Sequence, residues 1–256
     1  MTTFVIAKNT FGEALRKRIL WIFVIVALAL IFLSVSFSQF TFREQLTVIK
    51  SLGLGLIAVV GLLIVLVLGI NLISVEIERK TIYTILAKPV RRHEFLLGKF
   101  LGSMMTLFVN LLLMSVVFVG TLTWKNNWVV DLNLLKGVMM IFFQLMILGS
   151  VAMLFSVFTT PVVNFFMTSA VYIIGNLSDY TLTMTRSDSF VVKWFYMIVH
   201  YLTPNFANFN TQNPLIHPEV PIRGELVYYG VNILQALMWT SVLLIISVLA
   251  FEKRDM

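Results

Sequence analysis

The chain has 256 residues, of which 59% are hydrophobic and 12% are charged, and its formal net charge is +7 at pH 7. Soluble domains are typically about 45–50% apolar and about 25% charged, so this composition indicates an integral membrane protein. The chain contains no Cys, which excludes disulfides, thiolate metal sites and a cysteine nucleophile. The positive excess is explained by the positive-inside bias of membrane proteins, and we expect no nucleic-acid partner.

The first segment of the chain has the pattern of a basic amphipathic helix. Apolar residues recur at helical spacing from Phe4 through Ala7 to Leu15, and polar or basic residues fill the opposite face. We expect this helix to lie on the cytoplasmic membrane surface before the first span, in contact with lipid. A cleaved signal peptide is the alternative, but the leading polar region is long and further apolar segments follow.

Six apolar segments follow, and each falls within or near the roughly 17–25 residues that cross a bilayer core. None of them contains Lys, Arg, Asp or Glu. The sequence therefore predicts an all-α integral membrane protein, a single domain covering residues 1–256 with six transmembrane helices. The predicted spans are 19–37, 52–75, 100–123, 137–158, 161–177 and 231–251.

The distribution of charge predicts the orientation of these spans. Placing both termini in the cytoplasm puts 12 Lys and Arg residues inside and 7 outside. Because short cytoplasmic segments carry an excess of positive residues, we expect the N and C termini to be cytoplasmic. The fourth and fifth spans are separated only by Thr159, Thr160 and Pro161. They should form an antiparallel hairpin, with the proline in the first turn of the fifth span.

The largest loop, residues 178–230, is then external. Residues 190–202 within it are strongly apolar and aromatic, but they are too few to span a bilayer. We predict a re-entrant or interfacial helix there, between the fifth and sixth spans. Residues 203–221 are rich in Asn and Pro and are predicted to form an ordered loop.

Residues 76–99 form the long charged interruption between the second and third spans, with six Lys or Arg residues and three Glu. A dense basic loop between two spans is typical of the cytoplasmic side. Lys88 precedes Pro89, and a residue before proline is disfavoured in the α region, so a short helix should end near Ala87. The segment is predicted to be a short helix, a proline corner and the start of another helix. This compact shape could serve as a binding surface for a partner protein.

This segment resembles the loop between the second and third spans of type-2 ABC exporter permeases. Lys80 stands where that family often has Gly, and Arg91 where it often has Ser or Thr. In the family this segment is the coupling helix, which transmits movement from a separate ATP-hydrolysing subunit. The chain is also similar to the nitrous-oxide-reductase-maturation permease group. The matching residues are Glu76 or Glu78, Thr81, Ile82, Leu86, Pro89, Val90, Arg92, Phe95, Leu96, Gly98 and Lys99.

The resemblance implies the type-2 exporter permease fold, in the cell (inner) membrane of a bacterium or archaeon. It implies a path enclosed by two permease subunits, identical or homologous, with ABC ATP-binding subunits docked below. This chain would bind no cofactor, because ATP and Mg²⁺ belong to the partner. Its basic residues could instead form a solvated loop that faces lipid headgroups. The residues expected to couple the permease to the ATPase are Glu78, Arg79, Lys80, Thr81, Ile82, Tyr83, Leu86, Pro89, Arg91 and Arg92.

No motif for catalysis or metal binding supports another chemistry. The one Gly-Lys pair, Gly98 and Lys99, lacks the rest of a nucleotide-binding loop. The three His residues show no metal-ligand spacing, and no nucleophile-elbow motif is present. We predict neither catalytic nor metal-ligating residues. Gly98 and Gly102 form a GxxxG pattern, which permits close helix packing and is a candidate dimer contact.

Several uncharged polar residues fall within the predicted spans. They either hydrogen-bond between helices or line a path for a substrate. The lack of intramembrane charge argues against proton- or ion-coupled transport, where carboxylates mark the pathway. The candidate path residues are Asn71, Asn110, Gln144, Asn164, Asn176 and Asn232.

Two other functional classes remain open alongside an exporter subunit. One is a membrane-embedded enzyme acting on lipid, with the external loop covering its site. The other is a membrane scaffold that anchors an ATPase without moving a substrate. Stimulation of a partner's ATPase by a substrate would favour transport over scaffolding, and activity of the isolated chain without ATP would favour an enzyme. The sequence does not identify the substrate.

Overall fold

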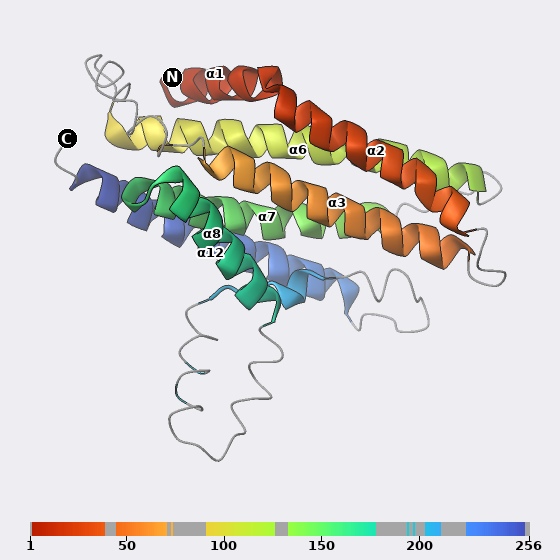
Figure 1. Cartoon of the computed structure of the whole chain (residues 1–256). Coiled ribbons are helices and arrows are strands. Elements are labelled where there is room, and N and C mark those ends of the chain that lie inside the picture. Colours follow the sequence, from red (N-terminus) through yellow and green to blue (C-terminus); the bar gives the residue numbers. More distant parts are fainter. Residues whose placement is uncertain are drawn as a thin grey trace.

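The computed structural model describes residues 2–38, 45–70, 73, 91–125, 133–177, 194, 197, 203–210 and 224–253. Over these residues the chain is entirely helical, without strands, as predicted (Figure 1). The helices are α1 (Thr2–Arg16), α2 (Arg18–Ser38), α3 (Gln45–Ile70), α6 (Arg92–Lys125), α7 (Asn133–Phe158), α8 (Pro161–Asn176), the 3₁₀ helix η1 (Ala207–Phe209) and α12 (Glu225–Glu252).

Five of the described helices are long and apolar enough to cross a membrane, namely α2, α3, α6, α7 and α12. The predicted fifth span, 161–177, corresponds to α8, which has 16 residues. At a rise of about 1.5 Å per residue it extends about 24 Å, less than the roughly 30 Å of a bilayer core. The described residues therefore contain five candidate spans by length and composition, and α8 is a shorter apolar helix packed on α3 and α7.

Four helices begin several residues before the apolar windows that predicted them. α3 begins at Gln45 rather than at residue 52, α6 at Arg92 rather than at 100, α7 at Asn133 rather than at 137, and α12 at Glu225 rather than at 231. Hydropathy marks the part of a helix that suits lipid, whereas backbone hydrogen bonds continue the helix through polar residues. Residues 92–99 form the first turns of α6, which confirms that residues 76–99 end in the start of another helix.

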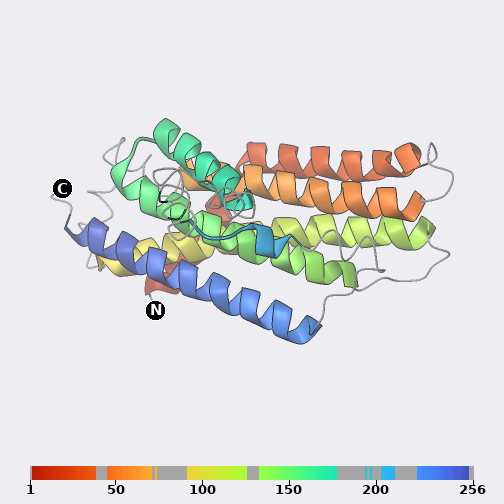
Figure 2. The same cartoon turned by 90° about the horizontal axis from the view of Figure 1, so that it is seen from below.

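Helix α7 is the centre of the bundle. It packs against α3, α6, α8 and α12, and 72% of its apolar window is buried. Helix α12 lies at the edge (Figure 2), with only 17% of its window buried. Polar side chains on α7 therefore face protein, whereas most of α12 is open to its surroundings.

One end of the bundle holds the N-terminus of α1, the start of α6 and the C-terminal end of α12 (Figure 1). We call it the terminal end. The turn between α7 and α8 lies at the same end, and Thr160 there is the N-cap residue that precedes Pro161. The predicted hairpin turn, with proline in the first turn of the following helix, is confirmed.

Candidate functional site

The predicted coupling segment is described only at its C-terminal edge. Arg92 begins α6 and Arg91 precedes it, while α3 ends at Ile70 on the other side of the segment. The site can therefore be built from the helix that receives the segment. Eight predicted coupling residues lie outside the described residues: Glu78, Arg79, Lys80, Thr81, Ile82, Tyr83, Leu86 and Pro89.

The first turn of α6 forms the C-terminal part of the segment and is held by two local hydrogen bonds. The backbone N–H of Arg91 donates to Oε2 of Glu94 at 3.3 Å. A Glu three residues into a helix that accepts from the preceding N–H is one half of a capping box. The N–H of Phe95 donates to the carbonyl of Arg91 at 3.1 Å. The end of the coupling segment is thus fixed in orientation relative to α6.

The same turn of α6 is attached to the last turn of α12. Nη1 of Arg92 donates to the carbonyl oxygens of Phe251 at 3.2 Å and Glu252 at 3.0 Å. The last carbonyls of a helix lack partners within it, and a cation there is favoured by the helix dipole. Nδ1 of His93 lies 3.8 Å from Oε1 of Glu252. The rings of Phe95 and Phe251 stack with centroids 6.4 Å apart.

Two glycines bring α1 into direct backbone contact with α6. A Cβ atom at Gly98 would lie 2.8 Å from the carbonyl oxygen of Thr3, and one at Gly102 would lie 2.5 Å from that of Ala7. The GxxxG surface is therefore covered by α1 of the same chain. Phe4, which was predicted on the apolar face, is 66% exposed, because the packed face of α1 carries Ala7 and the small residues beside it.

The candidate path residues fall into separate environments. Asn71 lies outside the described residues. Asn110 donates to the carbonyl of Thr106, one turn earlier in its own helix, at 2.7 Å. Nδ2 of Asn232 lies 3.4 Å from the carbonyl oxygen of Asn208. Neither of these two contacts joins one candidate path residue to another.

Asn164 connects α8 to the end of α3. Its Nδ2 donates to the carbonyl of Gly69 at 3.1 Å, and its Oδ1 accepts from Oγ1 of Thr168 at 3.0 Å. Both side chains are buried. This residue forms a hydrogen bond between helices, close to the C-terminal end of α3.

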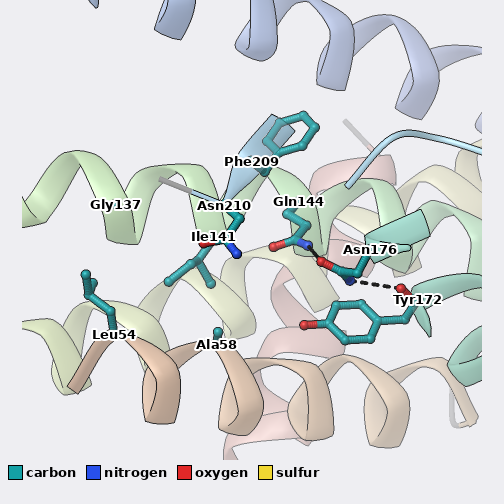
Figure 3. A pocket seen from close by; sticks show the side chains of 9 residues that line it. All are labelled: Leu54, Ala58, Gly137, Ile141, Gln144, Tyr172, Asn176, Phe209 and Asn210. Atoms are coloured by element: carbon teal, nitrogen blue, oxygen red, sulfur yellow. Dashed lines mark hydrogen bonds between the residues drawn. The ribbon is translucent and has the colours of Figure 1, made fainter. Parts of the chain in front are cut away.

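Gln144 and Asn176 are the two described candidate path residues that bond to each other. Nε2 of Gln144 donates to Oδ1 of Asn176 at 3.1 Å, and Nδ2 of Asn176 donates to the carbonyl of Tyr172 at 2.8 Å (Figure 3). They line a cavity of about 60 Å³ together with Leu54, Ala58 and other residues. Since one water needs about 10–15 Å³, the cavity has room for a few waters or one small polar group.

The segment around η1 covers this cavity. The N–H of Phe206 donates to the carbonyl of Gly175 at 3.0 Å, and the carbonyl of Asn208 accepts from the hydroxyl of Tyr228. Phe209, which is buried, lines the cavity. The segment therefore ties the end of α8 to the beginning of α12. Among the residues that the structure describes, no cluster of three or more His, Cys, Asp or Glu could hold a metal ion.

Residues 4–256 match the model of a family described as ABC-2 family transporter protein. The chain belongs to this family. No curated protein gives a significant match. Family membership makes this a multi-pass membrane permease subunit of an ABC transporter rather than an enzyme, and it implies association with ABC ATP-binding subunits.

The resemblance predicted a coupling segment for this ABC-2 permease but not the residues that contact its C-terminal end. The pattern contains Arg92 and Phe95, yet their partners Phe251 and Glu252 are distant in sequence and carry no motif. The bonds of Arg92 go to backbone carbonyls, which every residue has. Phe206 was likewise missed, although two Phe residues in an Asn-rich loop are a signal that part of the loop is buried.

Replacing Asn164 with Leu is expected to destabilise this permease modestly. Hydrogen bonds between membrane helices contribute about 0.6 kcal/mol on average and at most about 1.7 kcal/mol. Thr168→Val removes only the bond to Asn164, so the double variant should lose less stability than the sum of the two single variants. Thermal unfolding in detergent measures this, and strict additivity would contradict the coupling of the two side chains.

Proposed function

We propose that this permease is the transmembrane subunit of an ATP-driven exporter, coupled through residues 76–99 to separate subunits that bind ATP and Mg²⁺. One observation carries the proposal. The residues that end the segment begin α6, and this part of α6 is bonded to α12 and packed on α1. A push on the segment would therefore act on three helices at once.

In the assembly we propose, two permease subunits, identical or homologous, enclose the substrate path in a bacterial or archaeal inner membrane. The terminal end faces the cytoplasm, in agreement with the charge distribution. α8 serves as the fifth of six spans, and residues 190–202 form the external re-entrant helix. The proposal includes a role in nitrous-oxide-reductase maturation, which rests on the resemblance to that permease group.

Gln144 and Asn176 are the best candidates for contact with a substrate, because they line a cavity. Asn110 and Asn164 have backbone partners within the chain, which favours a structural role for both. Asn71 and Asn232 complete the proposed polar lining. The cavity between α3, α7 and α8 holds only a few waters, so it would form one part of the substrate path and not the whole of it.

The test is to replace Tyr83 and Leu86 with Asp and to purify the chain by a C-terminal tag. We expect an ATPase with Walker motifs to co-purify with the parent. The charged variant should elute as a folded protein without that ATPase. Tyr83→Phe with Leu86→Ile is the matched control, because it keeps the apolar face of the segment. Normal ATP-dependent export by the charged variant would refute the coupling role.

A further inference from the structure

Between the described parts of α6 and α12, two hydrogen bonds and a ring contact lie at the terminal end. Deeper along the two helices lies a groove of about 360 Å³, open to the outside, with apolar walls that include Leu97 on α6 and Ile245 on α12. Helix α12 packs instead along α7. Between α6 and α12 the contact is concentrated on Arg92, Phe95 and their partners in the last turn of α12.

We propose that Arg92 is a positioning residue that makes α12 move together with α6 when the coupling segment is pushed. This inference rests on the proposed function and adds the last span to the helices that the segment drives. Without the bond, α6 could tilt while α12 stays packed on α7. The groove between α6 and α12 interrupts their packing, so a movement of α6 would not be transmitted to α12 there.

The chemistry of the bond suits this role. One guanidinium nitrogen of Arg92 serves the carbonyls of Phe251 and Glu252, which are the last two residues of α12. Charge-assisted hydrogen bonds are stronger than neutral ones, and the helix dipole adds to the attraction. The guanidinium is planar and has several donors in a fixed geometry. It therefore fixes the direction of the helix end as well as its distance.

The chain has no Cys, so engineered cysteines can carry spin labels at chosen positions. The experiment uses the complete transporter, with its co-purified ATPase, before and after trapping with ATP and vanadate. One label pair, Ile22→Cys with Leu101→Cys, reports α6 relative to α2. The other, Ile22→Cys with Leu249→Cys, reports α12. All three positions are exposed.

In the parent, both distances are expected to change when nucleotide is trapped. In Arg92→Gln, the change between positions 22 and 101 should remain, while that between 22 and 249 is lost. Arg92→Lys should restore part of the lost change, because it keeps the cation. Lys253→Gln is the control, since it removes a neighbouring cation from the same helix end without removing the bonds of Arg92. It should leave both changes intact.

Retention of the α12 change in Arg92→Gln would overturn this inference and leave the proposed function standing. Loss of both changes in that variant would also overturn it, because Arg92 would then act on the coupling segment itself. Absence of both changes in the parent would refute the proposed coupling, and this inference with it. If Arg92→Lys and Arg92→Gln lose the change between positions 22 and 249 equally, a positive charge at the end of α12 is not enough to couple the two helices. That result would contradict the role given to the cation.

Discussion

Replacing Gly102 with valine is expected to detach α1 from α6. A Cβ atom at this position would lie 2.5 Å from the carbonyl oxygen of Ala7 and 2.7 Å from Cβ of Thr10. These are not the ends of flexible side chains, so the helix as a whole must move. Overpacking typically costs about 1–3 kcal/mol, and valine here should reach the upper part of that range.

The measurement is the rate at which a maleimide labels Ala7→Cys, the only thiol in the chain. Ala7 is buried against α6, so labelling should be slow in the parent background and at least about tenfold faster with Gly102→Val, which corresponds to about 1.4 kcal/mol. Gly120→Val is the matched control, because Gly120 lies on the same helix and a Cβ there would contact no other part of the described structure within 4 Å. Unchanged protection in Gly102→Val would contradict the glycine contact.

Replacing Phe206 with alanine is expected to release the segment around η1 and to open the cavity beneath it. Phe206 is 0% exposed, and its ring lies 6.1 Å from that of Tyr172, centroid to centroid. Truncating a buried Phe to Ala usually costs about 3–5 kcal/mol. Both the packing of the ring on α8 and the fixed position of Asn208 should be lost.

Two readouts test this expectation, the midpoint of thermal unfolding and maleimide labelling of Leu54→Cys in the cavity wall. Leu54 is 0% exposed, so its replacement should react only after the segment moves. Phe32→Ala is the control, because Phe32 is 57% exposed on α2. If Phe206→Ala lowers the midpoint without speeding labelling, the segment has a packing role but does not cover the cavity.

Much of the fold was predictable because charge and hydropathy respond directly to the membrane. Apolar runs without Lys, Arg, Asp or Glu located α2, α3, α6, α7 and α12. The starts of α3 and α12 were missed because hydropathy does not mark the residue at which helical hydrogen bonding begins. Gln45 and Glu225 are polar residues that a hydropathy window assigns to loops, yet they begin helices.

The site was less predictable because its partners are backbone atoms or distant residues. The polar residue Asn164 stands out in the sequence, but the carbonyl of Gly69 that it binds does not. The GxxxG pattern indicated close packing, while the partner, α1, could have been any helix or another chain. For α1, helical spacing alone does not tell which residues of the apolar face meet the bundle and which stay exposed, as Phe4 does.

The length of α6 has a mechanical consequence. Its 34 residues extend about 51 Å at about 1.5 Å per residue, well beyond a hydrocarbon core of roughly 30 Å. The contact with α1 at Gly102 lies about 15 Å from Arg92 and about 35 Å from Lys125 along the axis. A rigid α6 that pivots at this contact is an unequal lever. A sideways displacement of the Arg92 end then produces a displacement about twice as large, in the opposite direction, at the Lys125 end on the far side of the membrane.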